Sequence, residues 1–197
     1  METVAEKLLT ADEYFTLEAK SEVRHEYYDG ELIEMPGETT TANLIAGNLY
    51  VLLHILFKKM PYLVFTHDVK LMVYRDKIYR YPDLVVIHAM GDHKKYVTDP
   101  LLIVEVLSEG TEDVDREKKR LEYFGLATLQ YYVMVHQDTP IVELYSRSGK
   151  SWQYDFYTAL TDTLSLLFFE AEIALTDIFE GISFEKKEDA EKRLSQG

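Results

Sequence analysis

Two acidic residues border the most apolar part of the chain. Asp83 precedes four apolar residues, and Glu105 follows another apolar run. If the two runs are antiparallel strands folded back at residues 88–100, with Ile87 facing Leu101, then Asp83 faces Glu105 at their far end. Like charges opposite each other in a sheet are unfavourable unless positive charge lies between them. The spacing therefore predicts a divalent cation held by Asp83 and Glu105.

Each acid also has a simpler explanation. Aspartate before a strand is a common turn residue, and glutamate after a strand can extend into solvent. A shared metal site is favoured because Asp83 and Glu105 lie at equal distances along their strands from the predicted Ile87–Leu101 pair and so face each other.

A third candidate is Lys119, which follows Glu105 in a predicted helix. Metal-dependent hydrolysis of a phosphodiester needs a cation that polarises the phosphate and a group that positions water. A helix that begins just after the strand can direct the Lys119 ammonium back toward Glu105. The alternative is a surface ion pair between Asp115 and Lys119 at i, i+4, which contributes only about 0.3 kcal/mol. The sequence leaves both interpretations open.

The elements that must position these residues follow from periodicity and turn signals. Thr10 with Glu13 has the pattern of a helix N-cap, and Asp29-Gly30 is a strong hairpin signal. Helices are predicted at about 10–20, 40–59 and 115–124, with one further turn at 176–179. Strands are predicted at 24–28, 31–35, 62–65, 69–74, 77–81, 84–87, 101–104 and 131–135, followed by a β meander at 141–146, 151–157 and 166–169.

This order predicts the α/β (α+β) class, with a mixed sheet, an N-terminal hairpin and a C-terminal β meander. With 197 residues and 47% apolar composition, the chain is long enough for one substantial core. We predict a single domain over residues 1–183 and a charged tail over 184–197.

Composition limits the function. The absence of cysteine excludes disulfides, thiolate zinc sites and cysteine nucleophiles. Neither a signal segment nor a long apolar run is present, which predicts a cytoplasmic protein without membrane contact. A formal charge of −14 opposes binding to nucleic acid unless positive charge is concentrated locally or a metal is bound. One such concentration is Arg116, Lys118, Lys119 and Arg120, although for all but one of them a solvated helix face paired with neighbouring acids explains the pattern at least as well.

Pro82-Asp83, then Glu105 at the end of the next strand, then a helix with a lysine, resembles the core of the PD-(D/E)XK nucleases, whose order is αβββαβ. The chain is more closely similar to the Uma-type putative restriction endonucleases of bacteria over roughly residues 10–180. The similar segments are 24–27, 30–31, Met35, 43–45, 82–84, 100–108, 115–116, Lys119, Tyr123 and 129–133. The resemblance implies a nuclease-like site that uses Mg²⁺ (or Mn²⁺), with Asp83 and Glu105 as ligands and Lys119 as the ammonium.

Two positions depart from the pattern of the relatives. Leu107 stands where the superfamily usually has lysine, and Ala42 stands where many relatives have histidine. Additional site residues proposed on the sequence are Glu26, Glu38, Ser108 and Asp115. Glu26 also fits an exposed strand position, and Ser108 fits a capping or lining residue better than a nucleophile, because no histidine lies near it in sequence.

Two functions therefore stand side by side. The first is a metal-dependent endonuclease that hydrolyses DNA through activated water, without a covalent intermediate. The second is a nuclease-fold protein with weak or no activity that serves as a nucleic-acid or protein interaction module, favoured by Leu107, Ala42 and the acidity. We further predict a homodimer, because one small domain contacts little duplex, and C-terminal aromatics offer an interface.

Overall fold

A six-stranded mixed sheet forms the centre of the computed structural model, which describes residues 8–35, 37–89, 95–108 and 114–184, with the backbone alone at 114–116. Only β7 and β8 are parallel, and the other neighbouring pairs are antiparallel. In spatial order the strands are β10 (Ser151–Tyr157), β9 (Val142–Ser148), β8 (Tyr131–His136), β7 (Pro100–Leu107), β6 (Leu84–His88) and β3 (Tyr62–Thr66).

The predicted αβββαβ order is confirmed. Along the chain, α2 (Thr40–Leu56) leads to β3, β6 and β7, and α3 (Arg120–Phe124) then leads to β8. The inserted hairpin of β4 (Leu71–Tyr74) and β5 (Ile78–Arg80) belongs to a second sheet. Within the described ranges, no helix is long and apolar enough to span a bilayer.

The second sheet is built largely by the N-terminal hairpin. Its order is β2 (Glu31–Glu34), β1 (His25–Tyr28), β5 and β4. Asp29 and Gly30 both have positive φ, as a two-residue hairpin turn requires. Before this hairpin, α1 (Ala11–Glu18) begins at Thr10 with the predicted capping box to Glu13.

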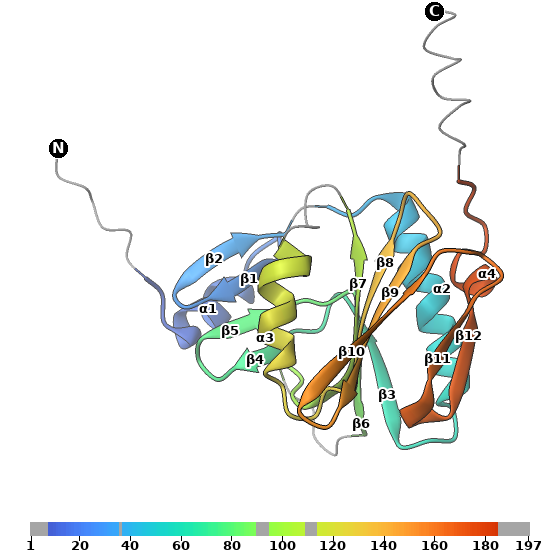
Figure 1. The fold of residues 1–197 in the computed structure, drawn as a ribbon. Helices are drawn as coiled ribbons and strands as arrows, with labels where there is room; N and C mark the ends of the chain where they lie inside the picture. Colours follow the sequence, from blue (N-terminus) through green and yellow to red (C-terminus); the bar gives the residue numbers. More distant parts are fainter. Residues whose placement is uncertain (1–7, 36, 90–94, 109–113, 185–197) are drawn as a thin grey trace, which may run out of the picture.

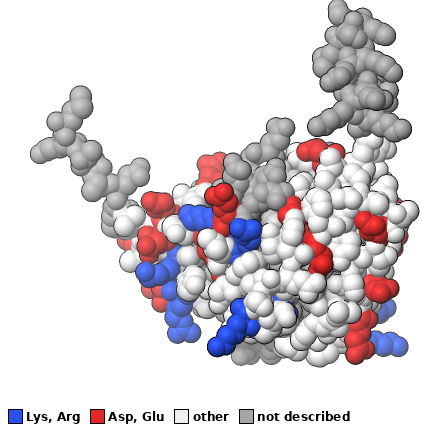
Figure 2. Space-filling model, in the orientation of Figure 1, with Lys and Arg blue, Asp and Glu red and all other residues white. Residues whose placement is uncertain are grey.

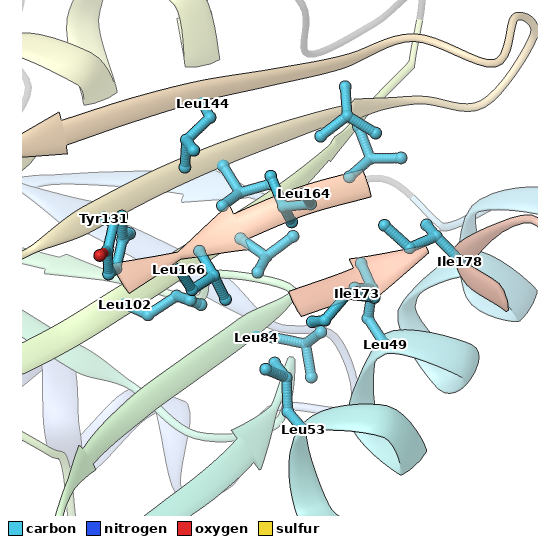
Figure 3. Packing of buried hydrophobic residues seen from close by; sticks show 14 of the residues in the cluster. Leu49, Leu53, Leu84, Leu102, Tyr131, Leu144, Leu164, Leu166, Ile173 and Ile178 are labelled. Atoms are coloured by element: carbon cyan, nitrogen blue, oxygen red, sulfur yellow. The ribbon is translucent and has the colours of Figure 1, made fainter. Parts of the chain in front are cut away.

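The two faces of the large sheet bury different partners (Figure 1). On one face, Leu49 and Leu53 of α2 pack with Leu84 and Leu102 (Figure 3). The hairpin of β11 (Thr163–Leu166) and β12 (Ala171–Ala174), together with α4 (Leu175–Ile178), completes that layer. The other face meets the second sheet and α3.

Alternation along β7 decides on which side Glu105 lies. Ile103 and Leu107 belong to the cluster shared with the second sheet, whereas Leu102 and Val104 face α2. Because side chains two residues apart share a face, Glu105 points toward the second sheet and α3.

Two segments differ from the expected elements. The predicted helix at 115–124 is divided into a π-helical turn, η1 (Val114–Lys119), followed by α3. The strand expected at 166–169 ends at Leu166, and the chain continues as a 3₁₀ turn, η2 (Leu167–Phe169). In this turn Leu167 is exposed, whereas Phe169 is buried in the core. The predicted tail lies outside the described residues except for Phe184.

Candidate active site

The strand register brings the two predicted acids to one end of the β6–β7 pair. Leu84 pairs with Val104, so Asp83, one residue before β6, stands opposite Glu105. A β-bulge places Ile87 opposite Pro100, so the expected Ile87–Leu101 pair was wrong, although the consequence for the acids holds. The N–H of Val106 donates to Asp83 Oδ2 at 2.5 Å. Both acids line a pocket of about 80 Å³.

Lys119 reaches this pocket from the helical turn before α3. Its Nζ lies 3.3 Å from Glu105 Oε1 and 3.3 Å from Glu26 Oε1. Only 7% of Lys119 is exposed, so the surface alternative does not describe it. The Asp115 side chain lies outside the described part of the structure.

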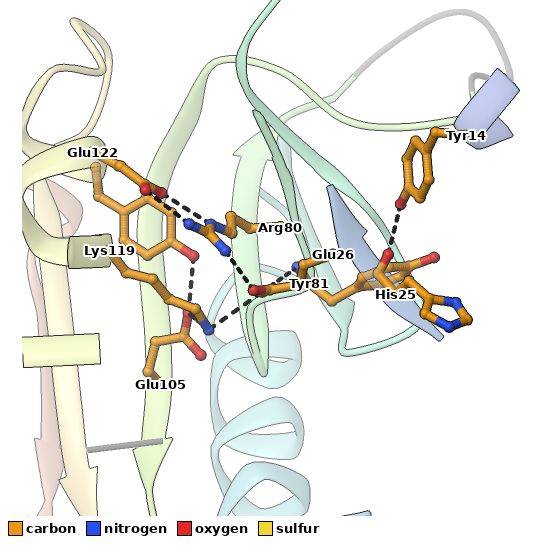
Figure 4. A network of polar contacts seen from close by, with 9 residues as sticks. Tyr14, His25, Glu26, Arg80, Tyr81, Glu105, Lys119 and Glu122 are labelled. Carbon is orange, nitrogen blue, oxygen red and sulfur yellow. Dashed lines mark hydrogen bonds and ion pairs between the residues drawn. The ribbon is translucent and has the colours of Figure 1, made fainter. Parts of the chain in front are cut away.

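Glu26 is a buried member of the cluster, not an exposed strand residue. Its second oxygen, Oε2, accepts from Arg80 Nη1 at 2.7 Å (Figure 4). Arg80 is fully buried and also donates to both oxygens of Glu122, from Nε at 2.9 Å and from Nη2 at 2.7 Å. Bidentate pairing of this kind fixes the carboxylate and the guanidinium in one geometry.

Charge pairing outweighs burial at Glu26. Burial by itself raises the pKa of Glu26, but the positive charges of Lys119 and Arg80 and the hydrogen bonds from Arg80 and Tyr81 hold that pKa below its usual value. For Arg80, burial alone lowers the pKa, whereas hydrogen bonds to Glu122 and the charge of Glu26 raise it above the usual range. Glu26 and Arg80 therefore carry opposite charges at neutral pH.

Tyr123 holds Glu105 from α3. Its hydroxyl donates to Glu105 Oε1 at 2.9 Å, and its ring packs edge-on against Tyr132. Burial raises the pKa of Tyr123 well above its usual value, and the Glu105 carboxylate adds to that shift. The hydroxyl thus keeps its proton and remains a donor to Glu105.

Two further proposed residues, Glu38 and Ser108, also belong to this site. Glu38 and Ser108 line the same pocket as Asp83 and Glu105. Glu38 comes from the segment just before α2 and also lies 4.0 Å from Nδ1 of His67. The structure therefore gathers Asp83, Glu105, Lys119, Glu26, Glu38 and Ser108 around one site.

Asp83 and Glu105 are the two carboxylates of this pocket that could hold a metal ion such as Mg²⁺. Among the described residues, no three His, Cys, Asp or Glu side chains form a metal-ligand group. Mg²⁺ commonly takes one or two carboxylates and keeps water and substrate oxygens as its other ligands. Five carboxylates (Glu26, Glu38, Asp83, Glu105 and Glu122) share this region with the two cations Arg80 and Lys119, which leaves a formal charge of −3 that a divalent ion would reduce.

A comparison with protein families identifies the chain. A family model described as Uma2, putative restriction endonuclease, matches residues 11–177. The chain belongs to the Uma2 family. Its αβββαβ core is the element order of the PD-(D/E)XK nucleases that the sequence resembled, and Lys119 in the helix after Glu105 is one of the residues by which it resembled the Uma-type family.

Two curated relatives of this Uma2 chain come from Synechocystis sp., and both are named as uncharacterized proteins. The protein sll1609 is 32% identical over 151 residues, covering 74% of this chain and 85% of the relative. The protein slr1290 is 29% identical over 179 residues, covering 89% of this chain and 94% of the relative.

A solved structure shares the fold. The crystal structure of a putative nuclease belonging to DUF820 from Anabaena variabilis matches with a TM-score of 0.73 and 17% identity. The match covers 87% of this chain and 97% of that chain. It supports the assignment of the mixed sheet and its helices.

Sequence reasoning on this Uma2 chain missed three members of the cluster. Arg80 and Glu122 were not singled out, and Tyr123 entered only through the family resemblance. One signal was present, because Glu122 and Tyr123 follow Lys119 at three and four residues, the spacing of one helical face. Arg80 had no comparable signal, since an arginine at the end of a short strand is usually exposed.

Proposed function

We propose that this Uma2 protein is a metal-dependent endonuclease that hydrolyses phosphodiester bonds of DNA. The observation that carries the proposal is the buried Lys119 ammonium, held between Glu105 and Glu26 beside the pocket that Asp83 lines. Burying charged groups costs free energy unless they are paired, so a structural role alone would be met more simply by apolar residues. A buried cluster of charged groups beside a pocket is a candidate functional site.

Asp83 and Glu105 are the residues that would hold Mg²⁺ or Mn²⁺. A bound ion of this type polarises a phosphoryl oxygen and lowers the pKa of a bound water. The protein's part is to fix the two carboxylates: the Val106 N–H orients Asp83, and the Tyr123 hydroxyl orients Glu105.

Lys119 would act on the phosphate. Its ammonium has three protons, and two carboxylates keep it at the pocket. From there it can donate to a phosphate oxygen on which negative charge increases during the reaction, and it can orient the attacking water. In this role Lys119 would supply the ammonium that Leu107 does not, whereas Ala42 and the acidity of the chain still favour the interaction module.

The charge distribution supports a binding face near the site. Figure 2 shows Lys and Arg atoms mainly over the half of the molecule that carries the second sheet and α3, interspersed with acids. Lys118 and Arg120 lie in this region, with Lys118 Nζ over the Tyr28 ring and Arg120 donating to the Tyr145 hydroxyl. Local positive charge lets an acidic protein approach a phosphate backbone.

Nicking of supercoiled plasmid in Mg²⁺ or Mn²⁺ tests the proposal. We expect nicking by the wild type, its loss in Asp83→Asn, and a decrease of about 10²–10³-fold in Lys119→Gln, because one charge-stabilising donor is removed. Chelation of the metal should abolish the activity. Wild-type protein that leaves the plasmid intact in both metals would refute the endonuclease assignment.

Calorimetry with Mn²⁺ separates metal binding from folding. Asp83→Asn keeps an oxygen that can accept from Val106, so it should fold while losing the heat of Mn²⁺ binding. Glu172→Gln removes one negative charge from an exposed position on β12 and should keep that heat. Equal heats from wild type and Asp83→Asn would remove Asp83 as a ligand.

A further inference from the structure

Glu38 lies between two pockets. It lines the pocket of about 80 Å³ that contains Asp83 and Glu105, and it also lines a neighbouring pocket of about 340 Å³, whose lining includes His67. The residue directly precedes Thr39, the N-cap of α2. Its side chain is 27% exposed, and its Oε1 lies 4.0 Å from His67 Nδ1. Glu38 therefore connects the candidate active site with a histidine of the neighbouring pocket.

We propose that Glu38 accepts the proton of the attacking water and that His67 is the positioning residue that holds the Glu38 carboxylate. The inference rests on the proposed nuclease function and adds the group that receives a proton in the reaction. In this step the water oxygen forms a bond to phosphorus while one of its protons passes to Glu38. The P–O bond to the leaving nucleotide breaks, its electron pair goes to the leaving oxygen, and that oxygen takes up a proton from solvent. Glu38 afterwards releases its proton to solvent.

The chemistry of the pocket leaves Glu38 as the proton acceptor. The Lys119 ammonium has three protons and no lone pair, so it donates and cannot take a proton from water. Asp83 and Glu105 are the carboxylates assigned to the metal ion, whose charge opposes protonation of its own ligands. Among the described residues that line this pocket, Glu38 supplies the remaining carboxylate. A water that donates to Glu38 keeps a lone pair of its oxygen free to attack phosphorus.

His67 provides an independent observation. Its Nδ1 is buried, and among the described residues it is the one buried side-chain nitrogen or oxygen without a hydrogen-bond partner. Glu38 Oε1, at 4.0 Å, is about 1 Å beyond hydrogen-bond distance. A buried nitrogen without a partner is costly, and a carboxylate attracts an N–H group but repels a nitrogen lone pair. A small rotation of the partly exposed Glu38 side chain therefore brings it to an Nδ1–H donor.

The turn after β3 holds His67 for this contact. Arg24 Nη1 donates to the backbone oxygen of His67 at 3.0 Å and lies 2.8 Å from Asp68 Oδ1. The other ring nitrogen, Nε2, lies 4.0 Å from Asp68 Oδ2. The imidazole thus stands between two carboxylates, with Glu38 at Nδ1 and Asp68 at Nε2, and a partner at each nitrogen sets the orientation of the ring.

Double-mutant kinetics of plasmid nicking test the proposal. Glu38→Gln removes the proton acceptor and should lower kcat by about 10²-fold or more. His67→Ala should lower kcat by about tenfold with KM unchanged, because a displaced carboxylate receives the proton less well. The double variant should be no slower than Glu38→Gln alone, because His67 acts only through Glu38. The matched control, His54→Ala, changes an exposed histidine of α2 and should keep kcat within about twofold.

Two further substitutions separate positioning from a role in folding. His67→Asn places an amide nitrogen near the position of Nδ1, whereas His67→Gln places one near the position of Nε2. We expect His67→Asn to restore kcat above that of His67→Ala, and His67→Gln to leave it low. Equal kcat values of the two variants, with different free energies of unfolding in urea, would show a folding role alone and overturn the positioning role.

Nuclear magnetic resonance of the metal-free protein gives a measurement that does not depend on activity. Glu38→Gln should shift the ¹⁵N signal of His67 Nδ1, because the neighbouring carboxylate loses its charge, whereas the exposed Glu172→Gln should not. An unchanged Nδ1 signal in Glu38→Gln, or losses of kcat that multiply in the double variant, would overturn the role of His67 while wild-type nicking keeps the nuclease function intact. Unchanged kcat in Glu38→Gln would remove Glu38 as the acceptor. A wild type that nicks no plasmid would instead refute the nuclease function, and with it the step assigned to Glu38.

Discussion

At the scale of the residue, Arg80 is the most constrained charge in the described structure. It is fully buried and pairs with Glu26 and Glu122, which come from a strand and a helix far from it in sequence. A buried ion pair has little net stabilising value over apolar residues, but removal of one partner leaves an uncompensated charge. The stability of the site therefore depends on keeping all members of the cluster.

Replacing Arg80 with methionine should lower the free energy of unfolding by about 3–5 kcal/mol, because Glu26 and Glu122 would stay buried without their cation. Urea denaturation measures this change. Arg24→Met is the matched control, since the Arg24–Asp68 pair is 2.8 Å long but its side chains are 42% and 71% exposed. The Arg24→Met substitution should lower the free energy of unfolding by no more than about 1 kcal/mol. Equal losses in both variants would contradict the account of the cluster.

At the scale of the element, the N-terminal hairpin and α2 place the two sides of the site. The hairpin turn presents Glu26 on β1, and α2 brings Thr39 and Ala42 to the pocket. Each element contains a glycine in a different setting: Gly30 lies in the hairpin turn with φ of 104°, whereas Gly47 lies inside α2.

Alanine at these two glycines should change stability in opposite directions. Gly30→Ala should destabilise by about 1–3 kcal/mol, because its φ is unfavourable for a side chain and the new Cβ would lie 2.7 Å from Leu8 Cβ. Gly47→Ala should stabilise by about 0.5–1 kcal/mol, because it lies in a helix and a Cβ there meets no atom within 4 Å. Thermal unfolding of both variants checks the signs. A stabilised Gly30→Ala protein would show that the turn has another geometry.

At the scale of the whole molecule, the ion cluster joins three parts of the fold. Glu26 and Arg80 belong to the second sheet, Glu105 belongs to the large sheet, and Lys119 and Glu122 belong to the helical segment between β7 and β8. Protonation of Glu26 would therefore weaken contacts between layers.

The pKa of Glu26 lies below 4.5 in the folded protein. Its contribution to stability is thus present above pH 4.5 and decreases as the pH falls through the lowered pKa, where the folded state also takes up the proton. We expect the stability advantage of wild type over Glu26→Gln to shrink between pH 6 and pH 3, measured by urea unfolding at each pH. The surface variant Glu172→Gln should stay within about 0.5 kcal/mol of wild type at neutral pH. An advantage that does not change with pH would exclude Glu26 as the titrating group.

Local sequence determined much of the fold and part of the site. The cap at Thr10, the turn at Asp29-Gly30 and the periodicity of α2 are short-range signals, and the structure confirms them. The opposition of Asp83 and Glu105 was also predictable, because alternation and chain reversal fix the register of neighbouring strands.

Only the tertiary structure decided how the cluster is connected. Arg80 meets Glu26 54 residues away and Glu122 42 residues away, and Thr39 meets Gln137 98 residues away. Such pairs depend on which sheet and helix surfaces pack together, and on the π-helical turn that ends at Lys119. A charged side chain has no periodicity of its own that reveals whether it will be buried, so its partners become visible only when the layers are assembled.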